Sequence, residues 1–193
     1  MDWRTVDRGL LEWTYGLGLP GTPVEVVTHV ATRGGVWLLA ALLLAAFGRG
    51  LTRRTGAALL AGLVLHVLLL ETALKSVVQR PRPCIALGIP LRDGIVDPAT
   101  YSFPSGHSAA SFLAAWVLGA RFPRLRLPLL ALAGLVAASR VALGAHYPTD
   151  VAAGAVLGSV LGIALARTFG LRPDDDLRPA VAGTAGDGGA AAS

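Results

Sequence analysis

Apolar residues fill most of this chain in long runs that short polar turns separate. The runs show no strict alternation of apolar and polar positions, which favours helices over strands. Five runs are candidates for membrane-spanning helices, at 23–47, 55–78, from 105 or 106 to 121, 127–143 and 148–169. A helix needs about 17–25 residues to cross the hydrocarbon, so the third and fourth runs are close to the lower limit. We therefore expect an all-α polytopic membrane bundle of about five transmembrane helices.

Two flanking segments differ from these runs. Residues 3–18 mix Trp, Tyr and Leu with Arg, Asp and Glu, which is typical of an amphipathic helix in the membrane interface. A frayed N-terminus is the alternative. From residue 171 the chain is rich in Gly and Ala and of low complexity, which predicts disorder. The expected organisation is an interfacial segment over 1–21, a membrane domain over 22–170 and a disordered cytoplasmic tail over 171–193.

Composition supports the membrane interpretation. Hydrophobic residues make up 53% of the chain and charged residues 15%, whereas soluble domains carry about 25% charged residues. A net charge of +5 would suit nucleic acid, but the arginines lie in short loops, as in membrane proteins, so we expect no nucleic acid partner. The single Cys84 excludes a disulfide framework within the chain. No cleavable signal peptide is visible at the start of the sequence.

The distribution of arginines predicts an orientation. They cluster after the first, third and fifth runs, at Arg49, Arg53 and Arg54, at Arg121, Arg124 and Arg126, and at Arg167 and Arg172. The positive-inside rule places these clusters and the C-terminus in the cytoplasm of a multi-pass plasma-membrane protein. The loop after the second run and the turn after the fourth then share the extracytoplasmic side.

Three polar clusters fall on that second side. The first is KSVVQRPRP, where Lys75 is the only lysine among 17 basic residues and Arg82 stands between two prolines. The compact ammonium group of Lys75 and the guanidinium of Arg82, whose backbone the prolines restrain, are suited to binding an anion. The alternative is a snorkelling basic collar at a helix end.

The second cluster opens the third run with Ser105, Gly106 and His107. Ser105 is a good N-cap, Gly106 allows close approach of a ligand, and the free amides of a first helical turn attract anions. The alternative is an ordinary capped helix with an incidental histidine.

The third cluster joins the fourth and fifth runs and contains Arg140, His146 and Asp150. Arg140 can fork onto two oxygens of a tetrahedral anion. We expect Asp150 to hydrogen-bond one imidazole nitrogen of His146, which would fix the tautomer and leave the other nitrogen as a nucleophile.

These residue types favour phosphoryl transfer without a metal or other cofactor. Three cations and a helix dipole would stabilise a dianionic phosphate, and two histidines would serve as nucleophile and acid. The sequence has no carboxylate cluster for magnesium, and its Cys and His spacings do not suggest zinc.

The three motifs resemble the signature of the type 2 phosphatidic acid phosphatase (PAP2) superfamily. The first motif runs from Lys75 to Arg82-Pro83, the second is Pro104-Ser105-Gly106-His107, and the third runs from Ser139-Arg140 through His146 to Asp150. The resemblance covers about 71–169 and extends to small bacterial undecaprenyl-diphosphate phosphatases. It implies that His146 forms a phosphohistidine, that Asp150 orients it, and that His107 protonates the leaving group and then activates water. The implied phosphate-binding residues are Lys75, Arg82, Ser105, Gly106 and Arg140.

The function expected is hydrolysis of a lipid phosphate or diphosphate, with undecaprenyl diphosphate as first candidate and phosphatidic acid or phosphatidylglycerol phosphate next. A vanadium haloperoxidase is disfavoured by the apolar runs. A transporter or a non-catalytic binder of phosphorylated lipids is the alternative from another class. Four further groups have open roles: Glu71, which is an ion-pair anchor or a catalytic group, and His66, His29 and Glu25.

Overall fold

The computed structural model describes residues 3–16, 35–88 and 100–172, and every statement below concerns those ranges. All regular elements within them are helices. In chain order they are α1 (Trp3–Gly16), α3 (Gly35–Phe47), α4 (Leu51–Leu65), the π-helix η1 (His66–Leu74), α5 (Lys75–Val78), α6 (Pro83–Ala86), α7 (Gly106–Arg121), α8 (Pro123–Ala142) and α9 (Pro148–Thr168).

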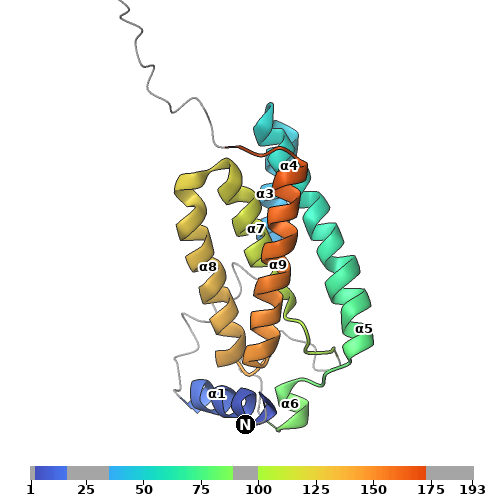
Figure 1. The fold of residues 1–193 in the computed structure, drawn as a ribbon, viewed down its shortest axis with the longest axis vertical. Coiled ribbons are helices and arrows are strands. Elements are labelled where there is room, and N and C mark those ends of the chain that lie inside the picture. The colour runs from blue at the N-terminus through green and yellow to red at the C-terminus, as the bar shows by residue number, and fades with distance from the viewer. Residues whose placement is uncertain (1–2, 17–34, 89–99, 173–193) are drawn as a thin grey trace, which may run out of the picture.

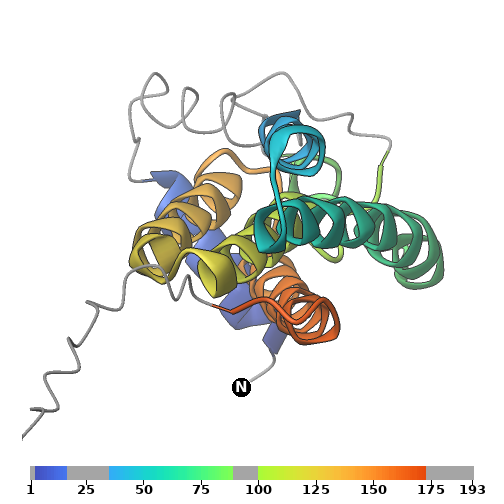
Figure 2. The ribbon, with the colours of Figure 1, turned by 90° about the horizontal axis from the view of Figure 1, so that it is seen from above.

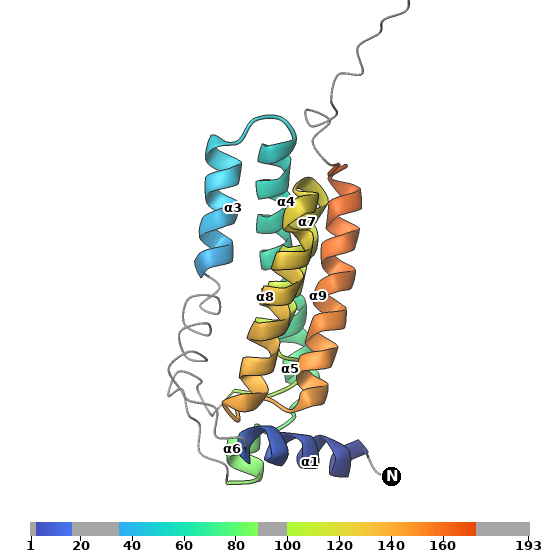
Figure 3. The same ribbon diagram turned by 90° about the vertical axis from the view of Figure 1, so that its left-hand side faces the viewer.

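The long helices run side by side along the long axis of the molecule, and α1 crosses one end of the bundle beneath α8 and α9 (Figures 1 and 3). Helices α4, η1 and α5 follow one another as a single rod that leans away from the bundle towards the end where α1 lies (Figures 1 and 2). That end receives the start of α7, the end of α8 and the start of α9.

Helix α7 forms the centre of the bundle, packed by α4, α8 and α9. Its closest partner is α9, because a glycine repeat at Gly154, Gly158 and Gly162 faces its backbone. A Cβ atom at Gly158 would lie 2.1 Å from the carbonyl oxygen of Ala109. Small residues at such spacing allow membrane helices to approach closely. The core consists of residues from α3, α4, α7 and α9, namely Trp37, Ala41, Ala58, Leu59, Ala110, Leu113, Ala114, Val117, Leu118 and Leu165.

Three helical segments are long and apolar enough to cross a membrane, at 51–86, in α8 and in α9. Helix α3 is apolar but has 13 residues, and α7 has 16, most of them buried between its neighbours. Large apolar side chains are exposed on the outer helices, among them Leu38, Leu39, Leu68, Leu69, Leu135, Val156 and Val160. The all-helical membrane fold is thus confirmed for the described residues, and the number of five spans stays a prediction.

Two helix boundaries differ from those expected. Helix α8 begins at Pro123 instead of residue 127, so Arg124 and Arg126 lie in its first turn. Proline is favoured at the first helical position, and the arginines are tolerated because this turn lies at the end of the bundle. The second run begins at Leu51 instead of residue 55. The expectations for 23–34, which include Glu25 and His29, and for the tail over 173–193 lie outside the described residues.

Candidate active site

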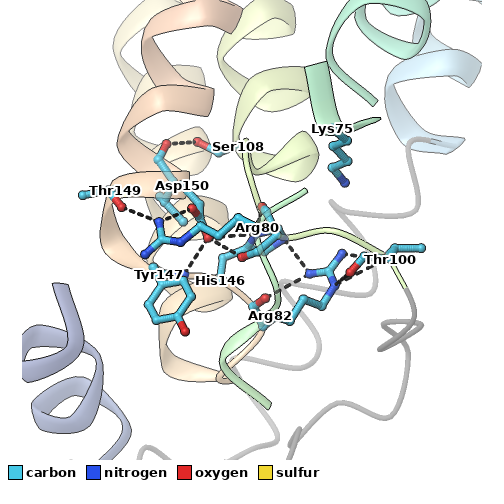
Figure 4. Close-up of polar contacts among 12 residues, drawn as sticks. Lys75, Arg80, Arg82, Thr100, Ser108, His146, Tyr147, Thr149 and Asp150 are labelled. Atoms are coloured by element: carbon cyan, nitrogen blue, oxygen red, sulfur yellow. Dashed lines mark hydrogen bonds and ion pairs between the residues drawn. The ribbon is translucent and has the colours of Figure 1, made fainter. Parts of the chain in front are cut away.

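The three polar clusters meet at the end of the bundle that α1 crosses. Figure 4 shows His146, Arg82 and Asp150 within one group of polar contacts, with Lys75 directed towards it from the end of the rod. His107, at the start of α7, has the charges of Lys75, Arg82 and Arg140 within electrostatic reach. Three stretches that are distant in the sequence therefore form one buried, positively charged site.

His146 is held by contacts to both ring nitrogens. Its Nδ1 lies 2.8 Å from the backbone carbonyl oxygen of Ser102. Because a carbonyl oxygen only accepts, Nδ1 carries the proton and Nε2 carries the lone pair of the neutral ring. Nε2 in turn lies 3.2 Å from Nη1 of Arg82, which only donates. The tautomer is therefore the one that a nucleophile at Nε2 requires.

Asp150 does not make the hydrogen bond to His146 that the sequence led us to expect. Its Oδ2 is 3.8 Å from Nδ1 of His146, beyond hydrogen-bond distance. The same oxygen accepts the hydroxyl of Ser102 and, at 3.0 Å, the amide of Tyr147. Asp150 thus shapes the loop and the turn that carry the partners of His146, while its charge lies close to the imidazole.

Arg80 is the site residue that sequence reasoning missed. Its Nη1 donates to Oδ1 of Asp150 at 2.6 Å and its Nη2 to Oδ2 of Asp7 at 2.5 Å. The guanidinium carbon also lies 3.8 Å from the ring centre of Tyr147. The signal available in the sequence was a second arginine in the RPRP stretch, two residues before Arg82.

Arg82 is buried and connects the loop before α7 to the turn that carries His146. Its Nε and Nη2 donate to the carbonyl and hydroxyl oxygens of Thr100, at 2.9 and 2.8 Å. Its Nη1 donates to the carbonyl oxygen of Ala145 at 2.9 Å, beside the contact with His146. One guanidinium therefore aligns three parts of the site.

The start of α7 differs in one detail from a standard capped helix. Ser105 occupies the N-cap position, yet its side chain makes no capping bond. Its hydroxyl oxygen is buried and has no hydrogen-bond partner among the described residues. The first amides of a helix have no intrahelical acceptor, so the hydroxyl and these amides together form a donor surface suited to an anion.

Glu71 and Gly106 lie against each other beside this surface. A Cβ atom at Gly106 would lie 1.7 Å from Oε1 of Glu71, so only glycine fits without displacing the carboxylate. Oε2 of Glu71 forms an ion pair with Nζ of Lys75 at 2.7 Å, as in the first of the two roles that the sequence left open. Glu71 thus positions the ammonium of Lys75 next to the start of α7.

Arg140 is fully buried at the end of α8, and its carbonyl oxygen accepts the amides of Ala145 and His146 at 3.1 and 3.2 Å.

Burial lowers the pKa of the His146 imidazole below its usual value. The nearby Asp150 carboxylate acts in the opposite direction, and the positive charges of Arg82 and Lys75 lower this pKa further. The ring is therefore neutral at neutral pH.

Fold and site together define a helical membrane protein in which two histidines lie among buried cations. The chain belongs to the PAP2 superfamily, whose sequence profile matches residues 55–174, and it is a phosphatase of that family. The family predicted from the three motifs is thereby confirmed.

Similar proteins support this assignment. The chain is 38% identical over 132 residues to a decaprenylphosphoryl-5-phosphoribose phosphatase of Mycobacterium tuberculosis, a match that covers 65% of this chain and 67% of that protein. It is 36% identical over 125 residues to an undecaprenyl-diphosphatase of Sulfolobus acidocaldarius, covering 64% and 59% of the two chains. The structure of a transmembrane PAP2 type phosphatidylglycerolphosphate phosphatase from Bacillus subtilis matches with a TM-score of 0.68 and 27% identity, covering 86% and 85%.

Proposed function

We propose that this protein hydrolyses a lipid phosphate or diphosphate through a phosphohistidine on His146, without a metal ion. The observation that carries the proposal is the fixed tautomer of His146, whose lone pair at Nε2 lies within a buried group of cations. A neutral, oriented imidazole beside preorganised positive charge is what in-line attack on a phosphate dianion needs.

In the first step, Nε2 of His146 attacks phosphorus, the N–P bond forms and the bond to the lipid oxygen breaks. His107, which takes up a proton when the phosphate dianion binds beside it, gives that proton to the leaving oxygen. The phosphate oxygens are held by Lys75, Arg82 and Arg140, with the hydroxyl of Ser105 and the first amides of α7, where Gly106 leaves room. The Nη1 donor of Arg82 that now contacts Nε2 turns to a phosphate oxygen when substrate binds.

In the second step, His107, now neutral, takes a proton from a water molecule whose oxygen attacks the phosphohistidine. The N–P bond breaks, inorganic phosphate leaves, and His146 regains its lone pair at Nε2. Asp150 lies close enough to stabilise the positive charge that His146 carries while phosphorylated. Asp150 makes no direct hydrogen bond to the ring. It holds the ring in place through its bonds to Ser102 and Tyr147.

The proposed substrate is a polyprenyl-linked phosphate or diphosphate, with undecaprenyl diphosphate first. Two relatives that match over more than 120 residues are named for polyprenyl-linked phosphates. The site lies at the end opposite the arginine-rich turns (Figure 1). The positive-inside rule then places it on the extracytoplasmic side of the plasma membrane, with the C-terminus in the cytoplasm.

The proposal is tested by phosphate release from purified protein in detergent, with prenyl and glycerolipid phosphates and diphosphates as substrates. His146→Ala is expected to lower turnover by at least about a thousandfold, because the proposed phosphoryl intermediate forms on the lone pair at Nε2. Its thermal stability in detergent and its elution on gel filtration serve as controls for folding. Full activity in excess EDTA is expected, and either turnover by His146→Ala close to the wild-type rate or a strict metal requirement would refute this mechanism.

A further inference from the structure

Asp7 is a buried carboxylate on a helix that the sequence assigned to the membrane interface. Asp7 is 2% exposed. A charged side chain is seldom buried in this way unless it has a partner. Its Oδ1 accepts the backbone amide of Thr149 at 3.0 Å, and its Oδ2 accepts the hydroxyl of the same residue at 2.7 Å. Asp7 therefore binds the first turn of α9 from the side, only three residues after His146 in the sequence.

The second oxygen of Asp7 also binds Arg80, and Arg80 binds the site. The guanidinium spans two carboxylates, with Nη2 on Asp7 and Nη1 on Asp150. The same Nη1 donates to the hydroxyl of Thr149 at 2.8 Å, and Figure 4 shows Arg80 lying across Tyr147. A planar guanidinium can make these contacts together, whereas the ammonium of a lysine is a point charge.

From these contacts we propose that Asp7 and Arg80 are positioning residues for the nucleophile. Helix α1 then contributes a functional residue, Asp7, to the active site. The chain of contacts runs from Asp7 through Arg80 to Asp150, whose partners Ser102 and Tyr147 fix the ring and the turn of His146. This inference rests on the function proposed above and adds residues that the three motifs do not include.

The two faces of α1 match this role. Leu11, one turn after Asp7, is fully buried against Val141 and Tyr147. Val6, Leu10 and Trp13 lie on a second face and are exposed, with Trp13 64% exposed. One face of the helix therefore secures the catalytic turn, while an adjacent apolar face is available to the lipid surface in which the substrate lies.

The test compares Asp7→Ala, Asp7→Asn, Arg80→Lys and Arg80→Ala with the wild type in detergent. Asp7→Ala and Arg80→Lys are expected to lower kcat about tenfold to a hundredfold while KM changes less than about twofold, since misplacing a reacting group reduces the rate of the chemical step. Asp7→Asn keeps an acceptor for the Thr149 amide but loses the negative charge that pairs with Arg80. Its kcat is therefore expected to lie between those of Asp7→Ala and the wild type. The Asp7→Ala/Arg80→Ala double variant is expected to lose less activity than the product of the two single losses, because Asp7 acts partly through Arg80 and partly through its direct bonds to Thr149.

The matched control is Glu12→Gln, which removes a carboxylate from the same helix. Among the described residues Glu12 is paired only with Arg8 at the surface, with side chains 52% and 61% exposed, so kcat is expected to stay at the wild-type value. A kcat for Asp7→Ala equal to that of Glu12→Gln would overturn the proposal. So would losses that multiply in the double variant, or a loss of kcat that only follows a fall in the folded fraction.

Hydrogen–deuterium exchange gives a readout that does not depend on turnover. Peptides that cover 145–151 are expected to exchange faster in Asp7→Ala than in the wild type, and at the wild-type rate in Glu12→Gln, because Asp7 protects the Thr149 amide. Unchanged exchange in Asp7→Ala would overturn the link. If the wild type released no phosphate from any lipid, the proposed function would fail, and the exchange result would still decide whether α1 holds the turn of His146.

Discussion

At the scale of single residues, the orientation of His146 comes from a backbone carbonyl rather than from a side chain. Sequence spacing suggested Asp150, because a carboxylate four residues after a histidine can reach its ring. The structure assigns the hydrogen bond at Nδ1 to the carbonyl of Ser102, 44 residues away. A main-chain acceptor has no signature in the residue types, so no pattern in the sequence could have pointed to it.

The same residue gives a prediction about pH. Burial and the neighbouring cations lower the pKa of the His146 imidazole from its ordinary value of 6.5. A lowered pKa means that the ring stays neutral, and able to attack, at pH values where an exposed histidine is already protonated. Titration of histidine-labelled protein by NMR, with His146→Gln to assign the resonance, is expected to show a midpoint below 6.5. A midpoint at or above that of an exposed histidine would contradict the described burial.

At the scale of helices, the contact between α7 and α9 depends on glycine. A Cβ atom at Gly154 would lie 2.4 Å from the carbonyl oxygen of Ser105, and one at Gly158 would lie 2.1 Å from that of Ala109. Since α7 carries His107 and α9 carries Asp150, this close packing also sets the distance between two parts of the site. The repeat is visible in the sequence, but the helix that it faces is not.

Gly158→Ala is expected to lower stability by about 1–3 kcal/mol, because the added methyl group meets backbone that cannot yield without moving a helix. Gly134→Ala in α8 is the matched control, since a Cβ atom there has nothing within 4 Å among the described residues. That control is expected to leave stability unchanged or slightly raised. Thermal unfolding in the same detergent compares the two variants, and equal midpoints would show that α7 and α9 are not in close contact.

The rod formed by α4, η1 and α5 shows where helix prediction from sequence ends. An apolar run at 55–78 correctly indicated a helix, but its middle section, His66–Leu74, is a π-helix. The wider turn changes the direction in which Glu71 and Lys75 project, and π-helical turns are frequent at functional sites. Residue types alone do not distinguish this geometry from an ordinary α-helix.

For the molecule as a whole, the arginine-rich turns between α3 and α4 and between α7 and α8 lie at the end of the bundle opposite the candidate site (Figures 1 and 3). The native Cys84 lies in α6 at the site end and is partly exposed. Arg49 is exposed in the turn between α3 and α4 at the other end. These two positions allow the proposed orientation to be measured.

In intact cells, a membrane-impermeant maleimide added outside is expected to label Cys84. A variant that combines Cys84→Ser with Arg49→Cys should react only after the cells are made permeable. Each protein is compared with Cys84→Ser alone, which sets the background. The reverse pattern of labelling would place the site in the cytoplasm and refute the proposed sidedness.

From the amino-acid sequence alone we could predict the membrane class, most helix positions and the family. Apolar runs need no tertiary contact to be recognised, and the three motifs keep their spacing within short stretches such as 139–150. How these parts contact one another depends on the packing of the folded chain. Asp7 meets Thr149 across 142 positions and Arg80 meets Asp150 across 70, and such contacts follow from helix packing, which places side chains together without leaving a local pattern.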